Sequence, residues 1–213
     1  MKRILSSTHA DAISVCKEIL LSGGIVVLPS DTVYGLACVA SNVQSVNRIY
    51  SVKGRNELKA LSVCVAQPEY VGTVAKLTIS TSLLNRLLPG PVTLIFPDST
   101  LPHLNRNASS LGVRVPPYEC FVSRVANTVN LPLALTSANL SGDPSALSIS
   151  QLSDEFLAKV DISIDGGSLN PKFDAGSTIV DLTQQGIFSI VRQGAAYNST
   201  IQILKTELTE LYT

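Results

Sequence analysis

The feature that most constrains the fold of this 213-residue chain is the alternation of short apolar runs with amphipathic segments. Residues 25–28 are continuously apolar, as in a strand covered on both faces, whereas Cys16, Ile19 and Leu20 before them repeat at helical spacing. Further strands are expected at 61–65, 92–96, 112–115, 133–136, 161–164, 178–181 and 186–191, and further helices at 43–50, 68–76, 80–88, 118–128 and 149–157. This alternation predicts a mixed α/β fold with a twisted sheet.

The chain is predicted to form one domain over residues 1–213. Its hydrophobic content of 45% can supply a sizeable core, and its length lies within the usual range of a single domain. The stretch 141–148 is rich in Ser, Gly and Pro and is expected to be an exposed loop rather than a linker between domains. Helical spacing of Ile201, Leu204 and Leu208 predicts a C-terminal packing helix over about 200–212.

Charge and cysteine content narrow the functional classes. Sixteen basic and sixteen acidic residues give zero net charge, so any anion must be bound by a local cluster rather than by a general field. The four cysteines are widely spaced and are expected to be buried free thiols in a reducing compartment, and two histidines leave little material for a zinc site. No apolar run approaches the ~20 residues of a membrane span. We therefore expect a cytoplasmic protein without membrane contact; the sequence leaves a mitochondrial pool open.

Polar residues follow several of the predicted strands. Residues 30–32 come directly after the strand at 25–28, and Thr136-Ser137-Ala138-Asn139 ends another apolar run. Ser177 precedes a predicted strand, and Arg192 follows one. Because ligands in α/β sheets commonly bind at strand ends, these groups are candidates for contacts with a small polar ligand. Turn formation and helix capping are the alternative interpretation.

Three cations suggest a phosphate-binding role. Lys53 and Arg55 are two residues apart, so on an extended segment they would share a face and hold one polyphosphate, with Lys59 able to join them. The alternative is an ordinary solvated basic loop. Arg114 lies inside the apolar strand at 112–115, where a cation usually faces either a carboxylate or a ligand cleft.

The standard nucleotide and hydrolase motifs are absent. The sequence contains no G-x-x-x-x-G-K-[ST], no G-x-G-x-x-G and no G-x-S-x-G pattern. A Ser-His-Asp enzyme would have to recruit His9, at an expected helix start, or His103, in a Pro/Asn-rich loop. Neither a P-loop, a dinucleotide-binding fold nor a serine hydrolase is supported.

Taken together, the motifs resemble those of the YrdC/Sua5 family, the threonylcarbamoyl-AMP synthases. The resemblance spans about residues 10–195, and its specificity comes from the order of seven individually weak motifs. These motifs are Pro29-Ser30-Asp31-Thr32-Val33-Tyr34-Gly35-Leu36, Lys53-x-Arg55, Pro89-Gly90-Pro91-Val92-Thr93, Gly112-Val113-Arg114-Val115-Pro116, Thr136-Ser137-Ala138-Asn139-x-Ser141-Gly142, Ser177-Thr178-Ile179-Val180-Asp181 and Arg192-x-Gly194.

The resemblance implies an open, twisted mixed sheet flanked by helices, with a deep concave pocket, in a short form that lacks the extra C-terminal domain of longer members. It implies a nucleotidyltransferase that condenses L-threonine, bicarbonate and ATP into threonylcarbamoyl-AMP and pyrophosphate. A separate transferase would use the product for t6A at position 37 of ANN-decoding tRNAs, so transient contact with tRNA or with that transferase is expected. Mg²⁺ is expected to arrive with ATP, without a metal bound by protein ligands.

The family pattern also implies site residues, carried over by position. The expected catalytic residues are Lys53 and Arg55. Expected ATP-binding residues are Arg55, Lys59, Ser110, Ser137, Asn139, Ser145 and Arg192. Expected L-threonine-binding residues are Thr32, Arg114, Thr136 and Ser177. The chain departs from the pattern mildly at Ser30, where relatives usually carry Thr, and at Ala60 and Cys64, where many carry Pro and His.

Two other functional classes stay open. One is a double-stranded RNA or tRNA-binding module without synthase activity, which zero net charge and the lack of a basic patch with interleaved aromatics disfavour. The other is a related carbamoyl-adenylate enzyme with a different acceptor, as in hydrogenase-maturation proteins. Those are much longer and carry additional modules.

Overall fold

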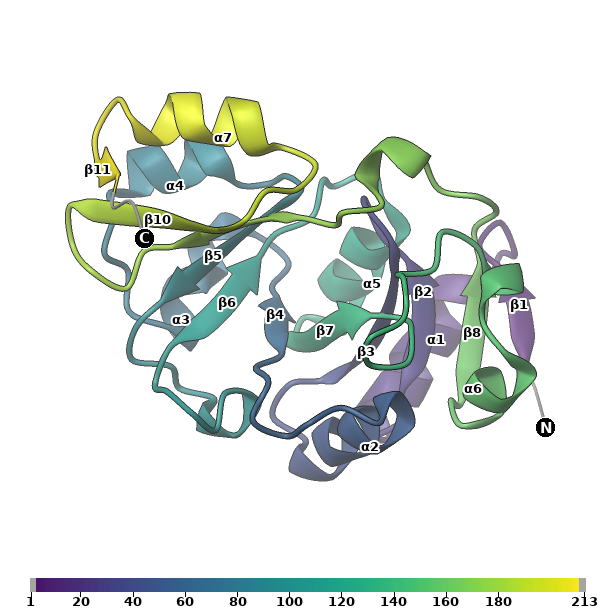
Figure 1. The fold of residues 1–213 in the computed structure, drawn as a ribbon. Coiled ribbons are helices and arrows are strands. Elements are labelled where there is room, and N and C mark those ends of the chain that lie inside the picture. Colours follow the sequence, from purple (N-terminus) through teal and green to yellow (C-terminus); the bar gives the residue numbers. More distant parts are fainter. Residues whose placement is uncertain (1–2, 211–213) are drawn as a thin grey trace.

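The computed structural model describes residues 3–210 and shows a mixed eleven-stranded sheet with helices on both faces (Figure 1). The strands are β1 (Ile4–Ser6), β2 (Val26–Pro29), β3 (Tyr34–Val39), β4 (Ser62–Cys64), β5 (Val92–Phe96), β6 (Leu111–Arg114), β7 (Leu133–Ser137), β8 (Ile162–Asp165), β9 (Thr178–Asp181), β10 (Ile187–Arg192) and β11 (Thr209–Glu210). Their order across the sheet is β1-β8-β2-β3-β7-β4-β6-β5-β9-β10-β11, with parallel and antiparallel pairs interspersed. The expected mixed α/β class is confirmed.

Seven α-helices accompany these strands in the described part of the chain. They are α1 (Ala12–Leu21), α2 (Val43–Lys53), α3 (Val71–Val74), α4 (Thr81–Leu87), α5 (Phe121–Val129), α6 (Asp154–Ala158) and α7 (Tyr197–Leu204). Short 3₁₀ turns are η1 (Pro68–Tyr70), η2 (Pro102–Leu104), η3 (Ile149–Gln151) and η4 (Pro171–Phe173). None of the helices among residues 3–210 is both long enough and apolar enough to span a membrane.

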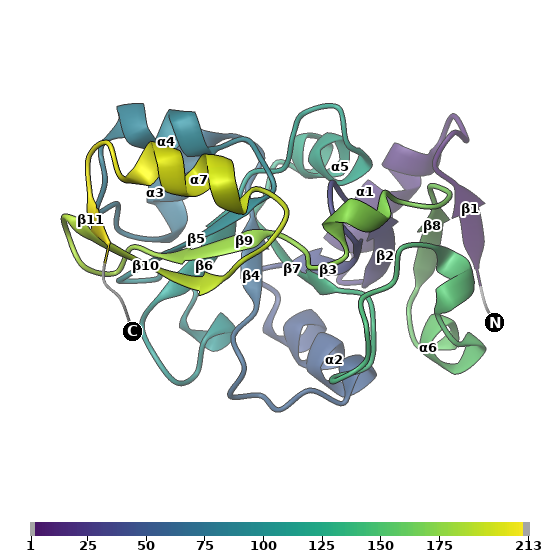
Figure 2. The same cartoon turned by 45° about the horizontal axis from the view of Figure 1, so that its top comes forward.

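Strand β2 shows why the sheet is covered on both faces. Its residues are all buried, and successive side chains enter different cores: Val27 joins the core on the α2 side, whereas Val26 and Leu28 pack with α1 and α5. This is the two-residue period of a strand between two helical layers. Figure 2 shows α2 on one side of the sheet and α1 with α5 on the other.

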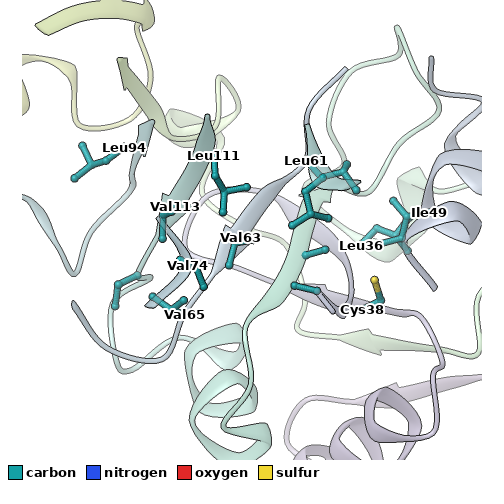
Figure 3. Packing of buried hydrophobic residues seen from close by; sticks show 14 of the residues in the cluster. Leu36, Cys38, Ile49, Leu61, Val63, Val65, Val74, Leu94, Leu111 and Val113 are labelled. Carbon is teal, nitrogen blue, oxygen red and sulfur yellow. The ribbon is translucent and has the colours of Figure 1, made fainter. Parts of the chain in front are cut away.

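The larger core continues into the second half of the sheet. Figure 3 shows Leu36 and Ile49 at one end of this core and Val113 and Leu94 toward the other, with Val63 of β4 between them. Helices α4 and α7 lie side by side in both ribbon views and close this core near β10. One continuous apolar layer therefore joins both halves of the sheet.

Three local expectations need correction. Tyr34–Val39 forms a strand that is not among those expected from the sequence, and it pairs with β2 in an antiparallel hairpin. The expected helix at 149–157 is divided into η3 and α6, because Ser153 caps a new helix start at the Phe156 amide. The predicted C-terminal helix is wrong in its bounds: α7 ends at Leu204 and residues 209–210 form β11, whereas residues 211–213 lie outside the described part.

The cysteines match the expected free thiols. All four are unpaired; Cys16, Cys38 and Cys64 are buried and Cys120 is half-buried. Burial raises the pKa of the Cys16, Cys38 and Cys64 thiols to about 12. A thiol with so high a pKa carries almost no thiolate near neutral pH, so these cysteines are packing residues.

Candidate active site

Polar strand ends surround a cavity of about 200 Å³. Three arginines line it, namely Arg55, Arg114 and Arg192. Eight hydroxyl side chains share the wall: Ser30, Thr32, Ser62, Thr93, Thr136, Ser137, Ser145 and Ser177. None of the residues lining this cavity in the described chain is acidic. Such a lining suits a small anionic ligand with several hydrogen-bonding groups.

Sheet register brings these residues together from distant parts of the chain. Gly35 at the start of β3 pairs with Ser137 at the end of β7, and Thr93 of β5 pairs with Ile179 of β9. Arg114 ends β6 and pairs with Cys64 of β4. The cavity is therefore set by neighbouring strands, which hold its polar groups more rigidly than a loop would.

Arg114 forms a buried ion pair. Its Nη2 lies 2.5 Å from Oδ1 of Asp31, and both side chains are less than a tenth exposed. Asp31 Oδ2 and Arg114 Nε are buried without a hydrogen-bond partner, so the pair is joined through one contact only. The sequence indicated either a salt bridge or a ligand cleft for Arg114. The structure shows both, because Arg114 pairs with Asp31 and also lines the cavity.

Arg192 is fixed against the start of β9. Its Nε and Nη2 donate to the backbone carbonyl of Ser177 at 3.0 and 2.8 Å, and Nη2 donates to Ser177 Oγ at 3.2 Å. Ser177 Oγ lies 2.7 Å from Thr93 Oγ1. Gly176 has a φ of +73°, and a Cβ there would lie 2.9 Å from Arg192 Nη2, so glycine permits this close approach. Burial, and then the nearby charge of Arg114, lowers the Arg192 pKa.

Arg55 enters the cavity from the loop after α2. Its Nη2 donates to the Ala60 carbonyl at 2.9 Å, and burial lowers its pKa. The loop is held from outside by Arg106, which contacts Glu57 and lies over the Tyr50 ring at 5.6 Å. Arg55 thus has part of its guanidinium occupied by the loop and part facing the cavity.

The sequence suggested that Lys53 lies beside Arg55 on an extended loop, but the structure places it elsewhere. It is the last residue of α2 and is 1% exposed, and Gly54 turns the chain away with a left-handed φ of 56°. Its Nζ donates to Ser137 O at 2.5 Å, Asn139 O at 2.8 Å and Asn139 Oδ1 at 2.9 Å. Burial, and then the charge of Arg55, lowers the Lys53 pKa to about 7.

Eight of the twelve predicted site residues line the cavity. They are Thr32, Arg55, Arg114, Thr136, Ser137, Ser145, Ser177 and Arg192. The other four, Lys53, Lys59, Ser110 and Asn139, do not appear in its lining. Lys59 is exposed, and Ser110 accepts from the Asn105 side chain at 3.2 Å.

Among the hydroxyl residues that line the cavity, Thr93 and Ser62 were missed as site residues. Thr93 is a polar residue inside the apolar run Val92–Phe96, and that contrast could have identified it. Ser62, at the start of β4, has no comparable signal. Ser30 lines the cavity and also stabilises its own turn, donating from Oγ to Val33 O at 2.6 Å.

The fold and the cavity define a mixed α/β protein with a pocket lined by arginines and hydroxyl groups from several strands. A family model described as "Telomere recombination", covering the Sua5, YciO and YrdC proteins, matches residues 18–194. The chain therefore belongs to the Sua5/YciO/YrdC family.

Named relatives carry a specific activity. The human threonylcarbamoyl-AMP synthase is 39% identical over 194 residues, which is 87% of this chain and 68% of the human protein. A variant structure of Sua5 from P. abyssi superposes with a TM-score of 0.88 at 28% identity, covering 99% of this chain and 66% of the other. The P. abyssi Sua5 complexed with L-threonine gives 0.83 at 29% identity, covering 93% and 58%. This chain thus spans about two thirds or less of the two P. abyssi Sua5 chains.

Proposed function

We propose that this protein is an L-threonylcarbamoyladenylate synthase, an enzyme of the nucleotidyltransferase class that supplies the threonylcarbamoyl group for t6A in tRNA. The observation that carries the proposal is the cavity lined by three arginines, with a single buried carboxylate paired to one of them. Such a surplus of positive charge suits a reaction among anions. The named relatives, and the threonine bound by one of them, support the same assignment.

The reaction needs positioning rather than a covalent enzyme intermediate. The threonine amine attacks bicarbonate to form a carbamate with loss of water. A carbamate oxygen then attacks the α-phosphorus of ATP in line, and the bond to the bridging oxygen breaks to release pyrophosphate. Fixed cations around the phosphates lower this barrier by offsetting charge that moves onto the leaving group.

On the threonine side we assign Thr32, Arg114, Thr136 and Ser177. Arg114 is held by Asp31 through one nitrogen only, so its remaining N–H groups can meet a carboxylate. The hydroxyls of the other three can accept from the ligand's hydroxyl or amine. Ser177 already accepts from Arg192, which links this side to the phosphate side.

On the ATP side we assign Arg55, Arg192, Ser137 and Ser145. The two arginines face the cavity and would contact phosphate oxygens, with Arg55 stabilising the α-phosphate as it is attacked. Lys59, Ser110 and Asn139 would contact ATP only after local rearrangement. Mg²⁺ would enter with ATP through phosphate oxygens and water, since the described residues contain no group of three or more His, Cys, Asp and Glu that could hold a metal.

The proposal is tested by measuring pyrophosphate release with ATP, bicarbonate and a panel of amino acids. We expect release with L-threonine and little with serine, valine or alanine. Release that is independent of threonine, or absent with every amino acid, would overturn the synthase assignment. In the latter case, specific binding of tRNA by the same sample would favour the RNA-binding alternative.

A further inference from the structure

The ammonium group of Lys53 has no hydrogen-bond donor left for a substrate. A lysine ammonium carries three N–H donors. Each has an acceptor here: Ser137 O, Asn139 O and Asn139 Oδ1, all within 2.9 Å of Nζ. A direct contact with phosphate would require one of these bonds to break.

All three acceptors belong to the segment that leaves β7. The same segment is tied to the lysine backbone, because the Ser141 amide donates to Lys53 O at 2.8 Å. Asn139 also bonds to other residues of this segment. Its Oδ1 accepts from Ser137 Oγ at 2.6 Å, and its Nδ2 donates to Asp143 O at 2.6 Å. The end of α2 therefore organises residues 137–143. Ser137 of this segment and Ser145, two residues beyond it, both line the cavity.

We propose that Lys53 is a positioning residue for the synthase site: its buried ammonium group holds the 137–145 loop in shape around one positive charge and so places Ser137 and Ser145. This inference rests on the proposed function for its effect on turnover, but its structural part concerns the free protein. The partners of the ammonium group are neutral oxygens, so no carboxylate among them offsets its charge, and the protonated lysine also adds to the positive field at the cavity.

The burial of Lys53 favours a functional role over a stabilising one. An ammonium removed from water without a carboxylate partner is costly, and its lowered pKa reflects that cost. An apolar isostere at a buried charged position is often tolerated by the fold. Lys53→Met should therefore keep the protein folded while releasing the loop.

The test measures hydrogen exchange in the free protein. In Lys53→Met, amides of residues 139–143 should exchange about tenfold faster or more, since charge-assisted hydrogen bonds are lost, while the sheet stays protected. Lys76→Met, the same change at an exposed lysine paired with Asp98, should leave this segment unchanged. Unchanged loop exchange in Lys53→Met together with a raised KM for ATP would show a direct phosphate contact and overturn the proposal.

A double-mutant cycle separates positioning from general damage. Lys53→Met and Asn139→Ala should each reduce threonine-dependent kcat/KM, and together should cost clearly less than the product of the two effects, because they disrupt one network. The effects of Lys53→Met and Thr93→Val on threonine-dependent kcat/KM should multiply in the double variant, because the two residues share no contact. Multiplication in the first pair would contradict the proposal. If Lys53→Met does not fold, Asn139→Ala alone must still raise loop exchange, and no rise would overturn the inference.

Because exchange is measured without substrates, it remains informative if the wild-type protein shows no threonine-dependent turnover. That result would refute the proposed function alone. Loss of the exchange effect with normal wild-type turnover would refute the positioning role alone.

Discussion

Arg114 and Lys53 are both buried cations near the cavity, at the ends of β6 and α2, yet they are held in opposite ways. Arg114 faces a carboxylate, Asp31, through one contact and keeps unsatisfied polar atoms. Lys53 has only neutral oxygen partners and every donor is used. The two cations therefore differ in a way that the sequence alone does not reveal. Arg114 keeps N–H groups available to a ligand, whereas all the N–H donors of Lys53 are bonded within the protein.

The largest effect should come from breaking the charged pair. Asp31→Leu leaves Arg114 buried without a countercharge, so the free energy of unfolding should fall by about 3 kcal/mol or more. Urea denaturation monitored by circular dichroism measures this. The exposed pair of Lys159 with Glu155 is the control, and Lys159→Met should leave the midpoint essentially unchanged. Equal midpoints for Asp31→Leu and wild type would mean that the pair carries no such penalty.

Next in size is the loss of a ligand-facing cation. Arg55→Ala should reduce kcat/KM for ATP by about 10- to 100-fold, the range of one charge-assisted hydrogen bond. Stability should change little, because the Arg55 side chain bonds only to carbonyls of its own loop. Initial rates over a range of ATP concentrations measure this, with Lys76→Ala as the matched surface control. A variant with wild-type kinetics would remove Arg55 from the phosphate site.

The third prediction uses the lowered pKa of Lys53. In the fold this pKa is about 7, against 10.5 for an ordinary lysine, so between these values the unfolded chain binds more protons. The free energy of unfolding must then rise with pH across that window. The destabilisation caused by burying the charge is at its full size below pH 7 and is absent above pH 10.5. The difference in unfolding free energy, wild type minus Lys53→Met, should increase by a few kcal/mol from pH 7 to 10. A flat difference would mean that Lys53 keeps its ordinary pKa.

The smallest effect is expected at Thr93. Thr93→Val keeps the shape of the side chain but removes the hydroxyl that lies 2.7 Å from Ser177 Oγ. Loss of one neutral hydrogen bond should raise the KM for threonine by about threefold to tenfold and leave the KM for ATP near its normal value. Steady-state kinetics with each substrate varied in turn checks this. A larger change for ATP than for threonine would place Thr93 on the nucleotide side.

The sequence predicted that Arg114 faces a carboxylate or a cleft, but it mispredicted the surroundings of Lys53, and both outcomes have physical reasons. Arg114 interrupts an apolar strand, a local contrast that signals either a partner or a ligand. Lys53 ends a helix, and its acceptors lie 84 and 86 residues further along the chain, so no local pattern distinguishes it from a solvated lysine. Strand β3 was not predicted because the polar residues 30–32 just before it and Gly35 within it suggest a turn, and the strand is defined by its pairing with β2 and β7.

The synthase assignment is tested most directly by identifying the product. ATP, L-threonine and ¹³C-labelled bicarbonate are incubated with the protein, and the mixture is analysed by mass spectrometry. The account predicts threonylcarbamoyl-AMP that carries the label from bicarbonate, formed in step with pyrophosphate. Pyrophosphate accompanied by AMP without any labelled adenylate, or no reaction at all with folded protein, would contradict it.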